Sequence, residues 1–261
     1  EISECLVGSE MCIRDSYNAD DPKIKLKIDH TYRVAALCER IAKAAGMCAY
    51  DVELAWLSGM LHDVGRFEQI KRYNTFSDAD SVDHAKFGAD LLFKDGLIST
   101  FLNGMVKCTG YKPGALEDRY SSDGVFLYDR LNKSDMEMLE LAIRCHNMYR
   151  IPQGLNRREQ AFCNVLRDAD KVDIFKVNID TPLEEIYNTT TEELMKSDIT
   201  DEVLEAFDEE HCILKAIRRT PADTVIGHVS LAYELVYDES VRITVEQGYL
   251  ATVSYTHLRA H

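Results

Sequence analysis

The chain of 261 residues has little proline and glycine, 5 and 13 residues respectively, which excludes collagen-like and disordered classes. It has no apolar run approaching the roughly 20 residues of a membrane-spanning helix, so we predict no membrane partner. Basic residues are also scarce, because 30 Lys and Arg face 45 Asp and Glu and leave a formal net charge of −15. This acidity disfavours binding to a nucleic-acid polymer and leaves room only for a local cationic pocket.

The 8 cysteines include no Cys-x-x-Cys pair. At this chain length, such spacing predicts neither a disulfide scaffold nor a zinc ribbon. A reducing compartment is the simpler interpretation, so we predict a cytoplasmic protein. The sequence leaves the oligomeric state open.

Both ends of the chain resemble translated adapter sequence of the kind found at the ends of assembled metagenomic fragments. We therefore predict that residues 1–16 and 253–261 are non-native tails and set them aside. Most acidic residues lie between these ends, so the acidity belongs to the remaining chain.

Apolar residues recur at helical spacing through nearly all of this remaining chain, and no strand-like alternation of useful length interrupts them. We predict an all-α fold, with a helical bundle over residues 17–180 and a helical extension packed on it over residues 181–252. With 46% apolar residues, a chain of this size can bury a substantial core.

Several local expectations follow from the pattern of residues. Residues 52–64 are apolar almost all round, which predicts a buried central helix. Residues 66–80 are polar and charged, and we predict a loop. A second loop, expected over residues 109–133, would cover the site and set its substrate choice. Ser134, followed by Glu137, predicts the N-cap of the next helix.

Histidine and aspartate side chains fall on the inward faces of different predicted helices. His62 and Asp63 end the most apolar helix, and an ionised Asp is rarely buried unless it is paired or bound to a metal. A lone His on an apolar face is ordinarily a core residue, but several on separate helices around Asp63 predict metal ligands. The candidate ligands are His30, His62, Asp63, His84, His146 and Asp170.

This mixed set of imidazole and carboxylate groups is typical of sites for divalent transition metals. Six ligands exceed the needs of one catalytic ion with open positions, and they suit two ions bridged by a carboxylate, for which we choose Asp63. We predict one or two divalent ions, drawn from Mn, Fe, Co, Ni, Zn and Mg.

The order of these residues resembles the H…HD…D signature of the HD-domain superfamily of metal-dependent phosphohydrolases. His30, His62-Asp63 and Asp170 correspond to that signature, and residues 61–65 (Leu-His-Asp-Val-Gly) resemble its HDIG form. His84 and His146 fall where binuclear members place two further ligands. The resemblance covers about residues 28–175.

The resemblance implies an all-α fold, a mono- or binuclear metal centre, and hydrolysis of a phosphate ester of a nucleotide or similar small molecule. Two branches of the superfamily fit poorly. The residues after His146 lack the Gly-Tyr-Pro motif of cyclic-dinucleotide phosphodiesterases, and Glu68 alone does not reproduce the acidic pair of the stringent-response enzymes.

A phosphohydrolase needs a cation that neutralises phosphate charge. Arg66, directly after the His-Asp-Val-Gly string, is the leading candidate for catalysis and substrate binding, because its planar fork suits phosphate. Lys171 and Arg33 are further candidates for substrate binding. We therefore predict a small phosphorylated substrate, with Asp63 and Arg66 as the catalytic residues.

Two alternatives use the same ligands. An HD-type di-iron oxygenase has a similar set of His and Asp ligands, and oxygen consumption would favour it. A non-catalytic nucleotide-binding module would use the same pocket, although such a module does not need a complete ligand set.

Overall fold

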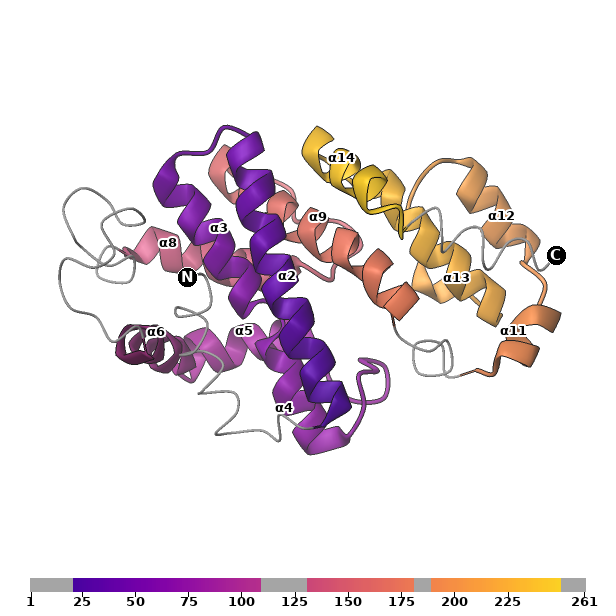
Figure 1. Ribbon diagram of the computed structural model, residues 1–261, viewed down its shortest axis with the longest axis horizontal. Helices are drawn as coiled ribbons and strands as arrows, with labels where there is room; N and C mark the ends of the chain where they lie inside the picture. Colours follow the sequence, from indigo (N-terminus) through magenta and orange to yellow (C-terminus); the bar gives the residue numbers. More distant parts are fainter. Residues whose placement is uncertain (1–20, 109–130, 181–188, 250–261) are drawn as a thin grey trace. The chain divides into compact units, whose positions relative to one another are not determined.

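The computed structural model describes residues 21–108, 131–180 and 189–249. Within these ranges every regular element is helical, which confirms the all-α fold (Figure 1). The chain divides into two compact units, one of residues up to 39 and 47–166, the other of residues 40–46 and those from 167 onward. The expected tails, and most of the expected loop over 109–133, lie outside the described residues.

The first unit holds the N-terminal helices and the residues predicted as the HD doublet. In chain order its elements are α2 (Pro22–Ala44), α3 (Ala49–Leu61), α4 (Val64–Tyr73), α5 (His84–Ala89), the π-helical turn η1 (Asp90–Lys94), α6 (Leu97–Cys108), α8 (Lys133–Cys145) and the start of α9 (Arg157–Asp180).

Helix α3 is the buried central helix that the sequence predicts, because most of its residues from Val52 to Leu61 are inaccessible to solvent. It packs closely against α2 at Gly59. A Cβ at that position would lie 2.6 Å from the Cα of Ala35, so only glycine permits this approach of the two backbones.

The loop predicted over residues 66–80 is wrong in its first half, because α4 continues to Tyr73. Phe67 and Ile70 are buried at helical spacing, whereas the charged Lys71 and Arg72 are exposed. The helix ends at Asn74, whose left-handed backbone (φ 52°) stops it. An irregular segment then leads to Asp83.

Helix α8 begins at Lys133 with Asn132 as its N-cap, so the prediction of Ser134 as the N-cap is wrong by two residues. Asp135 completes the capping box and is fully buried. Its carboxylate also accepts hydrogen bonds from Tyr50 Oη at 2.6 Å and from Arg158 Nη1 at 2.7 Å. These bonds tie the start of α8 to α3 and α9, and so fix the helix that leads to His146.

The second unit carries the C-terminal helices. After α9 it contains α11 (Thr191–Lys196), α12 (Asp201–Asp208), the 3-10 turn η2 (Lys215–Ile217), α13 (Pro221–Val229), the 3-10 turn η3 (Ser230–Glu234) and α14 (Asp238–Gln247). Val203, Ile213 and Ile226 form one of its apolar clusters. In neither unit do the described helices include one that is both long and apolar enough to cross a membrane.

Candidate metal centre

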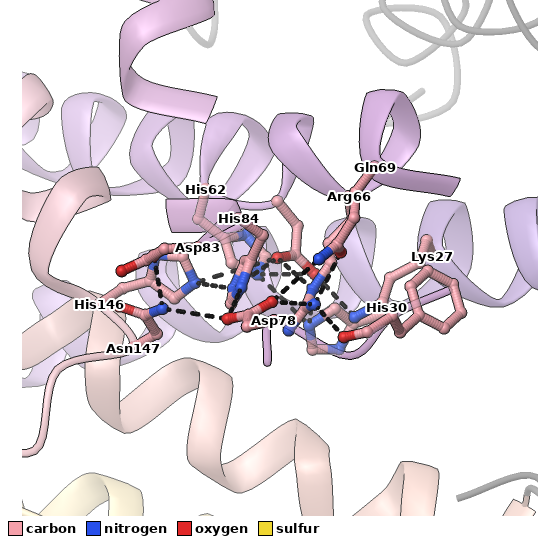
Figure 2. Close-up of polar contacts among 12 residues, drawn as sticks. Lys27, His30, His62, Arg66, Gln69, Asp78, Asp83, His84, His146 and Asn147 are labelled. Carbon is pink, nitrogen blue, oxygen red and sulfur yellow. Dashed lines mark hydrogen bonds and ion pairs between the residues drawn. The ribbon is translucent and has the colours of Figure 1, made fainter. Parts of the chain in front are cut away.

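The candidate ligands of the first unit lie at the ends of helices, apart from His30 in the middle of α2. His62 and Asp63 occupy the junction between α3 and α4, His84 is the first residue of α5, and His146 directly follows α8. Figure 2 shows the labelled imidazoles gathered in one place. All five side chains are buried.

Asp63 joins two groups of side chains that could hold a metal ion. One group contains His30 and His62, and the other contains His84 and His146. Its Oδ2 lies 3.6 Å from His30 Nε2 and 3.7 Å from His62 Nε2. Its Oδ1 lies 3.5 Å from His84 Nε2 and 3.9 Å from His146 Nε2. Each carboxylate oxygen therefore faces one pair of histidines.

Hydrogen bonds to Nδ1 determine the tautomers of three of these rings. His62 Nδ1 lies 2.7 Å from the carbonyl oxygen of Gly59, and His146 Nδ1 lies 2.7 Å from that of Ile143. A carbonyl only accepts, so in both rings Nδ1 carries the proton and donates it. His84 Nδ1 donates in the same way to Asp78 Oδ2 at 2.7 Å.

With Nδ1 protonated, each neutral ring turns the lone pair of Nε2 towards the centre. The Nε2 atoms of His84 and His146 are 3.1 Å apart, and those of His30 and His62 are 3.3 Å apart. When neutral, His84 and His146 both carry a lone pair on Nε2, and these lone pairs repel at this distance unless a cation lies between them. Since metal–nitrogen bonds are about 2.0–2.1 Å long, two ligands on one ion lie roughly 3 Å apart. The residues present therefore fit divalent metal ions.

The charges around the centre keep the ligands in the protonation states that metal binding requires. Burial opposes ionisation of Asp63, but Lys27, followed by His62, His84 and Arg66, holds the pKa of its carboxyl well below the usual range. Burial and the charge of Arg66 outweigh the bond to Asp78 and lower the pKa of His84 to about 4. At neutral pH Asp63 is ionised and His84 is neutral.

Arg66, the predicted phosphate-binding residue, points its guanidinium at the segment between α4 and α5. Its Nη1 donates to Asp78 Oδ1 at 2.7 Å, to the carbonyl oxygen of Phe76 at 2.5 Å and to Gln69 Oε1 at 2.8 Å. Its Nε lies 3.8 Å from Asp63 Oδ1. Arg66 is therefore next to the centre and also holds that segment in place.

Two charged residues at the centre did not emerge from the sequence. Lys27 donates from Nζ to Asp63 Oδ2 at 2.8 Å. Its spacing of one helical turn before His30 could have indicated it. Asp78 lies in an irregular segment where no periodicity predicts the direction of a side chain, so its contact with His84 could not be foreseen.

Three further candidates from the sequence are Arg33, Asp170 and Lys171. Arg33 lies half-buried on α2. Asp170 lies half-buried on α9 in the second unit, where Lys171 is buried with its Nζ 3.4 Å from the carbonyl oxygen of Glu234. The neighbouring Asp168 is fully buried and accepts the backbone N–H groups of Val236 and Tyr237. The roles of Asp170, Lys171 and Arg33 stay predictions.

Comparison with known proteins gave one family. The family model described as the HD domain matches residues 28–177, which is more than half of the chain. No curated protein and no solved structure gave a significant match.

Proposed function

We propose that this chain, which belongs to the HD-domain family of metal-dependent phosphohydrolases, hydrolyses a phosphate ester of a small metabolite or nucleotide. The observation that carries the proposal is the division of Asp63 between two histidine pairs, one facing each carboxylate oxygen. A buried site of this composition has no evident purpose in packing, because apolar side chains would fill the same space at lower desolvation cost.

The proposed ligands form two subsites that share Asp63. His30 and His62 would complete the first subsite, and Asp170 stays a further proposed ligand of the centre. His84 and His146 would complete the second subsite. Divalent ions bound in such a pair supply Lewis acidity and lower the pKa of a coordinated water towards neutrality.

The residues of the chain have separate parts in this proposal. Asp63 would hold the two subsites at a constant separation, because its carboxylate is buried and each oxygen faces one pair of histidines. Burial of the four histidines keeps bulk water from the ligand atoms, and the lowered pKa of His84 leaves its Nε2 atom available at neutral pH. Lys27 and Arg66 bring two positive charges beside Asp63, which would attract a phosphate dianion. Arg33 and Lys171 are proposed as further substrate contacts.

The test starts with metal analysis of the purified chain. Phosphate release is then screened over a panel of phosphomonoesters and phosphodiesters with added Mn, Co, Ni or Mg. We expect bound metal and turnover in the wild type, and loss of both in Asp63→Ala. Asp80→Ala is the matched control, because Asp80 is an exposed acid in the segment before α5. An Asp63→Ala variant that keeps its metal and its turnover would overturn the proposal.

The same donor set also suits non-haem iron, so the assay includes oxygen consumption with the iron-loaded protein. Turnover with Mn or Co under anaerobic conditions supports hydrolysis, whereas a requirement for iron and oxygen would indicate the di-iron oxygenase. Nucleotide binding without turnover of any substrate would indicate the non-catalytic module.

A further inference from the structure

Asp78 joins the second proposed subsite to Arg66 through its two carboxylate oxygens (Figure 2). Its Oδ2 accepts the Nδ1 proton of His84 at 2.7 Å, and Asn147 Nδ2 lies 3.5 Å from the same oxygen. Its Oδ1 accepts from Arg66 Nη1 at 2.7 Å and from Gln69 Nε2 at 3.1 Å. One side chain from an irregular segment therefore contacts a proposed metal ligand and a proposed phosphate-binding residue.

The segment that carries Asp78 is held by a buried amide. Gln69 is fully buried in α4, and its Nε2 also donates to Ser81 Oγ at 2.8 Å and to the carbonyl oxygen of Val82 at 3.0 Å. Arg66 adds its bond to the carbonyl oxygen of Phe76. With anchors on both sides of it, Asp78 has a defined position although its side chain is 25% exposed.

At the candidate metal centre, His84 differs from His62 and His146 in the partner of its Nδ1. His62 and His146 donate to backbone carbonyls, whereas His84 donates to a carboxylate. A carboxylate partner fixes the ring orientation and also makes the opposite nitrogen a stronger ligand, and loss of such a partner typically lowers metal affinity about 10- to 100-fold.

We propose that Asp78 is a positioning residue that sets the metal affinity of the second subsite through His84. This inference rests on the proposed function, since it concerns the same centre, but it is tested by metal binding alone. In this proposal the effect of Asp78 on the ion passes through the orientation and basicity of the His84 ring, to which it is hydrogen-bonded.

The experiment titrates the metal-free full chain with Co²⁺ and follows both visible absorption and heat of binding. We expect two ions in the wild type. In Asp78→Asn we expect affinity for one of them to fall by about 10- to 100-fold, with the other unchanged. Asp80→Asn, two residues away and exposed, is the matched control and should bind both ions normally.

A double-mutant cycle separates positioning from a general structural effect. His84→Ala alone should abolish binding of the second ion. Adding Asp78→Asn to His84→Ala should leave the affinity for the first ion as it is in His84→Ala. Should Asp78→Asn fail to fold, Asp78→Ser replaces it, because solvent can reach this partly exposed position and solvate the His84 N–H.

Two results would overturn the inference: a wild type that binds fewer than two ions, or an Asp78→Asn variant that binds both as the wild type does. Failure of the proposed function looks different. In that case two ions bind and respond to Asp78 as expected, but no phosphate ester in the panel is hydrolysed.

Discussion

The ammonium nitrogen of Lys27 lies 2.8 Å from Asp63 Oδ2, the same oxygen that faces His30 and His62. A divalent ion in the first subsite would bind this oxygen too. The ammonium group and the ion would therefore compete for the same carboxylate oxygen. The contact also means that Lys27 balances the negative charge of Asp63.

The first prediction concerns this competition. Lys27→Met should bind the first divalent ion about tenfold more tightly at neutral pH, because a neighbouring positive charge is removed. Tenfold corresponds to ~1.4 kcal/mol, well below the ~4 kcal/mol for two unit charges 4 Å apart at an effective dielectric constant of about 20. Calorimetric titration with Mn²⁺ measures the change. Lys25→Met, an exposed site on the same helix, should leave the affinity unaltered; equal or weaker binding in Lys27→Met would contradict the competition.

The second prediction concerns metal removal. A ligand that binds only the folded state at 100 times its Kd stabilises that state by about 2.7 kcal/mol. For a chain of this size, this corresponds to a rise in Tm of roughly 5–10 °C. Chelation should therefore lower the Tm of the wild type by that amount and leave the Tm of Asp63→Ala unaffected. Scanning calorimetry with and without chelator gives the comparison, and an equal response of both proteins would count against a metal at Asp63.

The third prediction concerns the crossing of α4 and α5. A Cβ on Gly65 would collide with the carbonyl oxygen of His84 and lie 2.8 Å from Gly88 N, so backbone would have to move. Gly65→Ala should cost at least about 2 kcal/mol in the free energy of unfolding, and should also disturb the position of His84. Urea denaturation and Co²⁺ titration measure the two effects. Lys86→Ala, on the exposed face of α5, is expected to stay within about 0.5 kcal/mol. An unchanged free energy of unfolding in Gly65→Ala would contradict the close backbone contact between α4 and α5 at this residue.

The fourth prediction uses His228, which lies in the second unit with its Nδ1 3.1 Å from Asn178 Oδ1. Burial, followed by the charges of Arg218 and Lys215, lowers the pKa of His228 from 6.5 to about 3. Below pH 6.5 the His228 ring binds a proton in the unfolded chain, whereas in the folded chain it stays neutral until the pH approaches 3. The free energy of unfolding should therefore fall as the pH drops from 6.5 towards 3, by about 1 kcal/mol between pH 6 and pH 5.

His228→Gln should remove this part of the pH dependence, as measured by urea denaturation at pH 7, 6 and 5. The matched control is His211, where the bond to Glu209 raises the pKa. Its stabilising contribution is present at low pH and is lost as the pH rises, so His211→Gln should change the profile in the opposite direction. An unchanged profile for His228→Gln would contradict the lowered pKa, because the folded and unfolded chains would then protonate the ring equally.

Helical periodicity was sufficient to predict the all-α fold and the inward direction of four histidines. The spacing of His30, His84 and His146 relative to their apolar neighbours depends only on the 3.6-residue repeat, which a sequence displays directly. The all-round apolar character of α3 likewise predicts its central position, and the HD doublet follows from it. Where periodicity was masked by charge, as over residues 66–73, the prediction of a loop was wrong, since burial of Phe67 and Ile70 outweighed their polar surroundings.

Only the tertiary structure decided which atoms of these residues meet. The division of Asp63 between two histidine pairs depends on the crossing of four helices, and on close backbone approaches at Gly59 and Gly65 that no local pattern encodes. Lys27 reaches Asp63 across a long stretch of sequence, and Asp78 reaches the nearby His84 from an irregular segment that no periodicity orients. A sequence reveals which residues could act chemically and on which face of a helix they lie. The distance between two side chains arises from packing, because it depends on every helix that lies between them.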